Sequence, residues 1–276
     1  MAKANLWQRL FPAGFLALAL ILFAPPGMAR DGKQEVDVEL VLAVDISYSM
    51  DMEEQQLQRE GYIKALTSPE VLQAIRAGAI GKIAVTYFEW AGANTQRVVV
   101  PWHIIDSPET ADAFVTKLLA TPISRWYRTS ISGAILYGHE LFENNGFTAP
   151  RLVIDISGDG ANNHGSPVID ARDRALRAGI VINGLPIMIN SSRRSAFDME
   201  DLDDYYTDCV IGGPGSFMIA IKEREQFVMA TRNKILREVA GLSDNTRVVP
   251  VNDAAKERAK MDCRVGEKEW QERYRN

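Results

Sequence analysis

An apolar run near the start of the chain constrains the fold more than any other feature. Residues 36–44 first alternate acidic and apolar side chains and then become continuously apolar. A short continuous apolar run that ends in polar residues is typical of a strand buried on both faces of a parallel sheet. Such a strand needs helices on both sides of its sheet, so the run favours an α/β fold.

The rest of the sequence alternates helices and strands. Helical spacing of apolar residues covers 52–77 (with a break at Pro69), 108–119, 130–143, 166–178 and 223–240; short strands are predicted over 82–90, 97–102, 151–156, 180–187 and 217–221. Residues 92–94 look like the turn of a hairpin. Residues 190–216 are predicted to be irregular. We therefore expect a doubly wound α/β fold, with a mostly parallel central sheet, one antiparallel edge strand and helices on both faces.

The first 29 residues are predicted to lie outside this fold. Lys3 and Arg9 precede an apolar run over residues 11–24, and Gly-Met-Ala at residues 27–29 offers small side chains for cleavage. This pattern is typical of a secretory signal peptide, and the run is shorter than the about 17–25 residues of a spanning helix. An uncleaved anchor is the alternative. We expect a periplasmic or secreted protein without a membrane span after cleavage.

Export changes the interpretation of the two cysteines. In an oxidising compartment a lone pair of cysteines usually forms a disulfide, so Cys209 and Cys263 are predicted to pair. Two buried free thiols are the alternative. The bond would tie the charged tail, residues 242–276, back to an α/β domain over residues 30–241.

Composition excludes several classes of function. The formal net charge of −5 argues against a nucleic-acid-binding protein, which is usually basic. Two cysteines are too few for a four-thiolate zinc site. The chain also lacks the Gly-x-Ser-x-Gly, His-Glu-x-x-His and Gly-Lys-Ser/Thr motifs of common hydrolases and nucleotide-binding enzymes.

Oxygen-bearing side chains follow the predicted strands at the edge where an open α/β sheet binds its ligands. They are Asp45, Ser47 and Ser49 after the first strand, Thr129 before the helix at residue 130, and Asp159 with Gly160 after the strand at 151–156. Carboxylate and hydroxyl oxygens are hard ligands that suit Mg²⁺, Mn²⁺ or Ca²⁺ better than zinc or copper. Hydroxyls are neutral, so a cation that they bind keeps much of its charge and attracts a carboxylate.

In this order and on these elements, the three pieces resemble the metal-ion-dependent adhesion site (MIDAS) of a von Willebrand factor type A (VWA) domain, over residues 36–240. The resemblance implies that Ser47, Ser49 and Thr129 bind a divalent cation directly or nearly so, and that Asp45 and Asp159 hold it through water. The open coordination position would take a carboxylate of a partner protein. The chain also resembles a bacterial group of exported VWA-like proteins without an assigned function, through residues 159–163 and 208–215.

Two parts of this ligand set have competitors. Asp155 could replace Asp159, because two residues separate the predicted strand from Asp159; we favour Asp159, which Gly160 follows. Thr129 could serve only as a helix cap, with Ser130 or Ser132 as the competing hydroxyls.

A second site is an open alternative beside the first. Asp51, Glu53 and Glu54 could bind calcium. We favour a simpler role for them, which is to stabilise the positive end of the helix that begins near residue 52.

Two functions are compatible with these residues. The first is an exported binding module that captures an acidic group of a partner protein through Mg²⁺, or through Mn²⁺ or Ca²⁺. The second is an exported metal-dependent hydrolase of phosphate esters, since an aspartate after the first strand is the nucleophile of some phosphatases. Those enzymes usually carry another aspartate two residues later, where this chain has Ser47. We therefore expect a binding module and not an enzyme.

Overall fold

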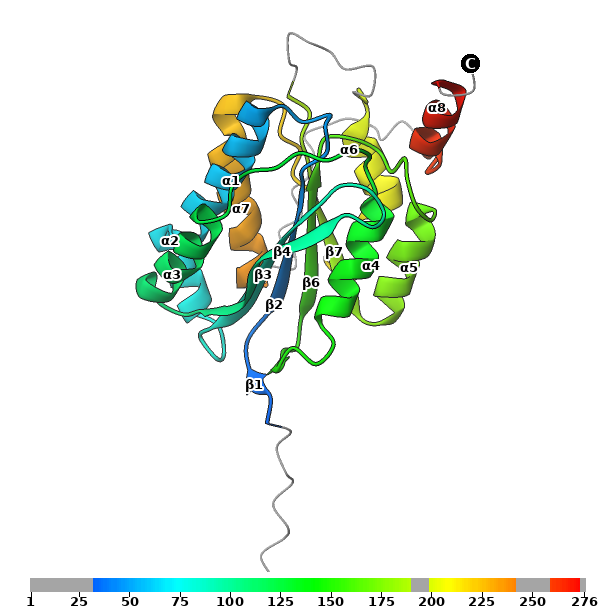
Figure 1. Cartoon of the computed structure of the whole chain (residues 1–276). Helices are drawn as coiled ribbons and strands as arrows, with labels where there is room; N and C mark the ends of the chain where they lie inside the picture. Colours follow the sequence, from blue (N-terminus) through cyan, green and yellow to red (C-terminus); the bar gives the residue numbers. More distant parts are fainter. Residues whose placement is uncertain (1–31, 190–198, 242–258, 274–276) are drawn as a thin grey trace, which may run out of the picture. The chain divides into compact units, whose positions relative to one another are not determined.

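The structure is a computed structural model that describes residues 32–189, 199–241 and 259–273 (Figure 1). The predicted signal peptide lies outside the described residues, as do residues 242–258 of the predicted tail. Within the described ranges, no helix has the length and the apolar character that crossing a membrane requires.

A five-stranded sheet forms the centre of the fold. Its strands, in spatial order, are β4 (Gln96–Ile105), β3 (Ile83–Trp90), β2 (Glu39–Asp45), β6 (Leu152–Gly158) and β7 (Ile180–Pro186). All neighbours are parallel except β4, which runs antiparallel to β3 at one edge. The predicted sheet is therefore confirmed. A separate parallel pair consists of β1 (Gln34–Glu35) and β5 (Phe147–Thr148).

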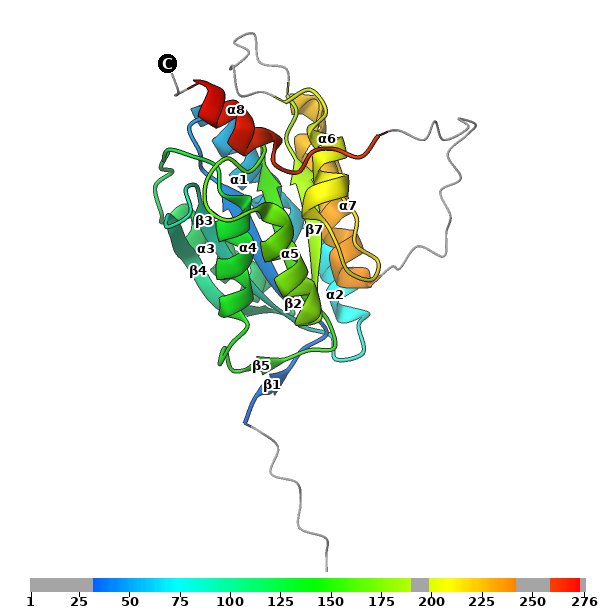
Figure 2. The ribbon, with the colours of Figure 1, turned by 90° about the vertical axis from the view of Figure 1, so that its right-hand side faces the viewer.

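Helices cover both faces of this sheet (Figures 1 and 2). One apolar core contains residues of α1 (Met52–Leu66), α2 (Pro69–Arg76), α3 (Pro108–Leu119) and α7 (Phe227–Ala240). The other contains residues of α4 (Ile131–Leu141), α5 (Val168–Arg177) and α6 (Leu202–Tyr205). Every residue of β2 is buried, as its apolar run predicts for a central strand covered on both faces.

Three segments differ from the prediction. Residues 217–221 form only isolated bridges to the β7 side of the sheet instead of a regular strand. Within the stretch expected to be irregular, α6 continues into a π-helical turn, Tyr206–Val210, whose buried side chains include Tyr206 and Cys209. The tail contains a helix that the sequence did not predict, α8 (Val265–Arg273).

The end of β6 also differs, and this difference matters for the site. The strand runs to Gly158, two residues beyond the predicted end at residue 156, because Ser157 and Gly158 still pair with β7. Asp159 therefore follows the strand directly, at the carboxyl edge of the sheet where β2 ends at Asp45.

Candidate metal centre

Four of the five predicted ligands are linked by hydrogen bonds. The backbone N–H of Ser47 donates to Asp45 Oδ1 at 2.7 Å. The hydroxyls of Ser47 and Ser49 lie 2.8 Å apart, and the Ser49 hydroxyl donates to Asp159 Oδ1 at 2.6 Å. A continuous chain of polar contacts thus connects the end of β2 with the end of β6.

Asp45 carries a buried carboxylate that the described residues satisfy only in part. Its Oδ2 is buried and accepts no hydrogen bond from them. A Cβ at residue 158 would lie 2.8 Å from this oxygen, so Gly158 makes room for the carboxylate beside β6. The pKa of Asp45 is raised to about 7, because the effect of burial exceeds the lowering by the hydrogen bonds from Ser47 and by the backbone N–H of Asp159. A buried oxygen without a partner is costly, and a bound cation would remove that cost.

Thr129 does not cap α4. Ser130 is the cap, since its hydroxyl accepts from the backbone N–H of Gly133 at 3.1 Å. The Thr129 backbone N–H donates to Asn163 Oδ1 at 2.9 Å, and its hydroxyl oxygen lies 3.9 Å from where a Cβ of residue 160 would stand. Of the three candidate residues at the start of α4, Thr129 lines the pocket with Ser47 and Ser49, whereas the hydroxyls of Ser130 and Ser132 lie near Gly165, farther along the loop after β6.

Asp155 lies away from the candidate site. It sits inside β6, where Lys234 Nζ of α7 lies 2.5 Å from its Oδ1 and the Tyr62 hydroxyl donates to its Oδ2 at 3.2 Å. Both side chains of this ion pair are fully buried, so the Asp155 carboxylate does not reach solvent. Of the two competing aspartates, Asp159 is the one that contacts the serine loop.

The acidic residues at the start of α1 serve the helix. Asp51 is its N-cap: the Asp51 carboxylate accepts from the backbone N–H of Glu54, and the Glu54 carboxylate accepts from the backbone N–H of Asp51, both at 2.8 Å. This reciprocal arrangement is a capping box. Glu53 pairs with Arg224 at 2.6 Å. The interpretation as helix-end residues is confirmed.

The hydroxyl residues line one pocket of about 340 Å³. Its wall consists of Ser47, Tyr48 and Ser49; Tyr127, Arg128 and Thr129; Gly160, Ala161 and Asn163; Met199; and Gly266, Glu269 and Trp270 of α8. In the part of the chain that the structure describes, no cluster of three or more His, Cys, Asp or Glu side chains could hold a metal ion. A cation at this site would therefore depend on the hydroxyls.

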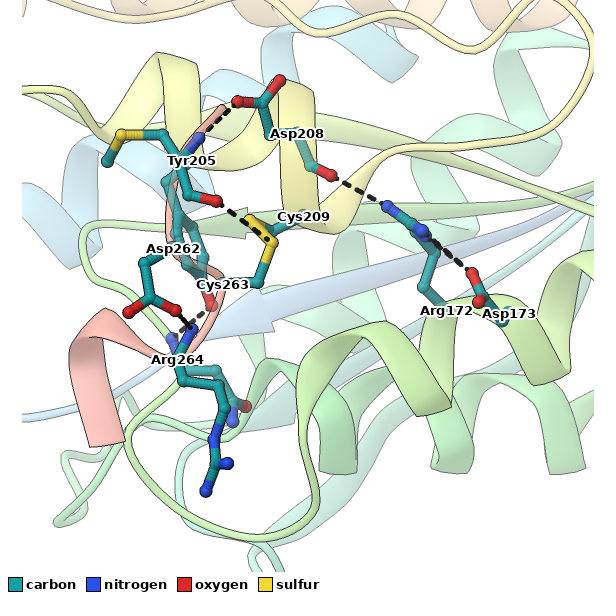
Figure 3. The surroundings of a disulfide bond; sticks show 10 residues. Arg172, Asp173, Tyr205, Asp208, Cys209, Asp262, Cys263 and Arg264 are labelled. Carbon is teal, nitrogen blue, oxygen red and sulfur yellow. Dashed lines mark hydrogen bonds and ion pairs between the residues drawn. A yellow bond between two sulfur atoms is a disulfide. The ribbon is translucent and has the colours of Figure 1, made fainter. Parts of the chain in front are cut away.

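Sequence reasoning missed the contribution of α8 to this pocket. The predicted disulfide is confirmed: Cys209 and Cys263 are bonded and hold the start of the α8 segment against the π-helical turn (Figure 3). Nearby, the backbone N–H of Met261 donates to Asp208 Oδ2 at 2.8 Å. The segment that carries α8 is highly charged and has no apolar pattern of its own. Cys263 was therefore the one feature of its sequence that indicated a contact with the domain.

Together, the sheet order and the position of the polar residues at its carboxyl edge give the protein a VWA-like α/β fold. Residues 35–243 match the family model described as "Protein of unknown function (DUF1194)", and the chain belongs to this family. No curated protein matches the chain.

Solved structures share the fold at low sequence identity. Proximal thread matrix protein 1 from the mussel byssus, with a zinc-occupied MIDAS motif, is 11% identical with a TM-score of 0.56, over 75% of this chain and 49% of that chain. The pilus adhesin SpaC from Lactobacillus rhamnosus GG is 13% identical with a TM-score of 0.54, over 76% of this chain and 31% of that chain. The chain thus spans half or less of the length of these relatives.

Proposed function

We propose that the protein is an exported binding module that captures an acidic group of a partner protein through a divalent cation. The observation that carries this proposal is the polar chain from Ser47 through Ser49 to Asp159, beside the unpartnered buried oxygen of Asp45. This arrangement fits a cation, because it gathers hard oxygen atoms beside a buried carboxylate oxygen, Asp45 Oδ2, that accepts no hydrogen bond from the described residues.

Each residue has a distinct role in this proposal. Ser47, Ser49 and Thr129 supply neutral oxygen atoms to the cation, while Asp45 and Asp159 orient the serines and offset part of its charge through water. An oxygen donor set favours Mg²⁺, with Mn²⁺ or Ca²⁺ as alternatives. When bound, the cation attracts a carboxylate, because its nearest protein ligands are uncharged.

The remaining parts of the chain complete the proposal. A signal peptide over residues 1–29 directs a bacterial protein to the periplasm or beyond, residues 30–241 form the VWA-like domain, and residues 242–276 form a tail held by the disulfide. The bond between Cys209 and Cys263 supports an oxidising compartment. We propose a binding protein and not an enzyme, because Ser47 stands where a phosphatase of the aspartate type would need its general acid.

Equilibrium binding of Mn²⁺, followed by the electron paramagnetic resonance of the free ion, tests the site. We expect one ion per chain, with affinity at least about tenfold lower in Asp45→Ala because the loss of a neighbouring charge costs more than about 1.4 kcal/mol. The matched control is Asp112→Ala, which removes an exposed carboxylate on α3. It should bind Mn²⁺ like the wild type.

A pull-down from periplasmic extract then tests the function. We expect a partner that is retained with Mg²⁺, released by a chelator and absent with Asp45→Ala. Capture that is unchanged by both the chelator and Asp45→Ala would contradict the proposal.

A further inference from the structure

Exposed apolar side chains gather beside the candidate metal centre. The large apolar residues exposed in the described ranges are Tyr48, Met52, Ile80, Leu119, Trp126, Tyr127 and Met229. Three of these seven, Tyr48, Trp126 and Tyr127, lie in two loops at this edge of the sheet, and Met52 begins α1 directly after the first loop. The second loop lies against the first, because the backbone N–H of Trp126 donates to the carbonyl of Ile46 at 2.9 Å. Exposed apolar groups that cluster in this way mark an interaction surface.

Two tyrosines of these loops form one wall of the pocket. The rings of Tyr48 and Tyr127 are stacked with their centres 4.4 Å apart, and both residues line the pocket together with Ser47 and Ser49. Tyr127 is 72% exposed, so most of this wall is available to a ligand. Arg125 lies over the Tyr48 ring at 4.6 Å and helps to hold it.

Helix α8 forms another wall, with Trp270 as its aromatic residue. Its position is fixed by close contacts as well as by the disulfide. A Cβ at residue 266 would lie 2.4 Å from the carbonyl oxygen of Asn162, so Gly266 permits the approach of the helix to the loop after β6. The Asn162 side chain also donates to Glu267 Oε1 at 2.8 Å.

Arg128 connects α8 with the loop that carries Thr129. Its guanidinium lies 3.2 Å from the centre of the Trp270 ring, and its φ of 75° is unusual for a residue with a side chain. The ring faces of Tyr48 and Trp270 are thus partly used within the protein. The edges of these rings and the apolar surface around them remain available to a ligand. Such surfaces suit aliphatic side chains better than a sugar, because a sugar packs against an open ring face.

We propose that the partner segment is an extended peptide in which the acidic residue is flanked by apolar side chains. The acidic residue would reach the cation, one neighbour would contact Tyr48 and Tyr127, and the other would contact Trp270. This inference rests on the proposed function and adds the chemical class of the partner.

Three short peptides test the inference on the mature protein in excess Mg²⁺, with binding followed by NMR. They are acetyl-Leu-Glu-Leu-amide, acetyl-Ser-Glu-Ser-amide and acetyl-Leu-Gln-Leu-amide. We expect the first to bind about fivefold or more tightly than the second, since apolar contacts add to the carboxylate, and the third to bind far more weakly than the first.

Single substitutions assign the preference to the two walls. Tyr127→Ser and Trp270→Ser should each reduce the ratio between the two glutamate peptides while the affinity for Mn²⁺ stays unchanged. The control is Leu119→Ser, on α3, which removes an equally apolar side chain that is 63% exposed and does not line the pocket. It should keep the wild-type ratio.

The outcomes separate the two proposals. Glucuronate, an acidic sugar, is measured in the same way as the peptides. Equal affinity for the two glutamate peptides, or tighter binding of glucuronate than of either peptide, would overturn the inference. Either result would leave the metal-dependent capture of carboxylates standing. Failure of the Leu-Glu-Leu peptide to bind at millimolar concentration would also overturn the inference. The proposed function fails on different results, which are unchanged Mn²⁺ binding in Asp45→Ala or partner capture that neither the chelator nor Asp45→Ala alters.

Discussion

Two aspartates at the end of one strand, Asp155 and Asp159, meet opposite surroundings. Asp155 faces the core beneath α7, where Lys234 lies 2.5 Å from it and 2.5 Å from Glu238, with all three side chains fully buried. Asp159 lies at the edge of the sheet and accepts from the hydroxyl of Ser49. Beside it, Asp45 keeps a buried oxygen that accepts no hydrogen bond, and it forms no ion pair with any lysine or arginine of the described residues.

The difference teaches how this fold treats buried charge. In the cluster of Asp155, Lys234 and Glu238, the chain supplies its own cation, and the surrounding polar groups Tyr62 and Asn183 donate to the carboxylates. At the edge of the sheet, the group that contacts the Asp159 carboxylate is the neutral hydroxyl of Ser49 and not a lysine. In the core two buried carboxylates share one lysine, whereas Asp45 forms no ion pair with a lysine or arginine of the described residues, so its position is suited to an external cation. The following predictions test this contrast.

The largest effect is expected from Lys234→Met. This change leaves Asp155 and Glu238 buried without their cation, which should lower the free energy of unfolding by about 3–5 kcal/mol. Urea unfolding at neutral pH measures it. The control is Lys268→Met, which removes an exposed ion pair with Asp262 and should cost less than about 1 kcal/mol. Similar losses in both variants would show that the buried cluster does not depend on its lysine.

The second effect is stabilisation by Mg²⁺. A cation at about 100 times its dissociation constant should raise the free energy of unfolding of the wild type by about 2.7 kcal/mol. Thermal unfolding with Mg²⁺ and with a chelator should show a smaller rise in Ser47→Ala and Thr129→Ala, because water can replace a hydroxyl, and none in Asp45→Ala.

Asp155→Asn sharpens the same experiment. This variant should be less stable than the wild type but should keep the full rise with Mg²⁺, because Asp155 contacts the internal lysine and not the serine loop. Equal rises in all the variants would mean that the cation binds elsewhere.

The third effect concerns pH and the buried cluster. The pKa of Glu238 is raised to about 7 from its ordinary 4.5, because the effects of burial and of the charge of Asp155 exceed the lowering by Lys234 and Asn183. The folded state therefore holds the proton more tightly than the unfolded state. The stability that this proton provides is fully present below pH 4.5 and is lost as the pH rises through 7.

Urea unfolding at pH 5 and pH 8 in a chelator measures this loss. Glu238→Gln should reduce the loss by about 1–3 kcal/mol, because the neutral amide does not titrate. Arg151 also interacts with Glu238. It is present in both the wild type and Glu238→Gln, so it does not account for a difference between them. The same slope with pH in the wild type and in Glu238→Gln would contradict the prediction.

The smallest effect is expected from Asp45→Asn without metal. The amide keeps an oxygen for the N–H of Ser47 and removes a buried charge that lacks a partner, so the metal-free protein should become more stable by about 1 kcal/mol. Urea unfolding in a chelator tests this, with Asp112→Asn as an exposed control that should not change stability. A loss of stability in Asp45→Asn would show that the protein itself compensates the charge of Asp45.

Local sequence patterns were enough to predict the sheet and the start of the site. The continuous apolar run at residues 40–44 and the largely apolar stretch at 83–90 are stable only when both faces are covered, and β2 and β3 are in fact fully buried. The pattern Asp45-x-Ser47-x-Ser49 directly after such a strand could only lie at the carboxyl edge of the sheet. The contact of Ser49 with Asp159 agrees with that placement.

Tertiary structure alone decided the end of β6 and the position of α8. Ser157 and Gly158 have no strand preference of their own; they continue β6 because β7 pairs with them, and this pairing is what puts Asp159 at the edge and Asp155 in the core. Helix α8 has no continuous apolar face. It lines the pocket because the disulfide to Cys209 and the close approach of Gly266 to Asn162 hold it there. The cysteine pair indicated that the tail returns to the domain, but the contact between Gly266 and Asn162 joins distant residues and leaves no local pattern in the sequence.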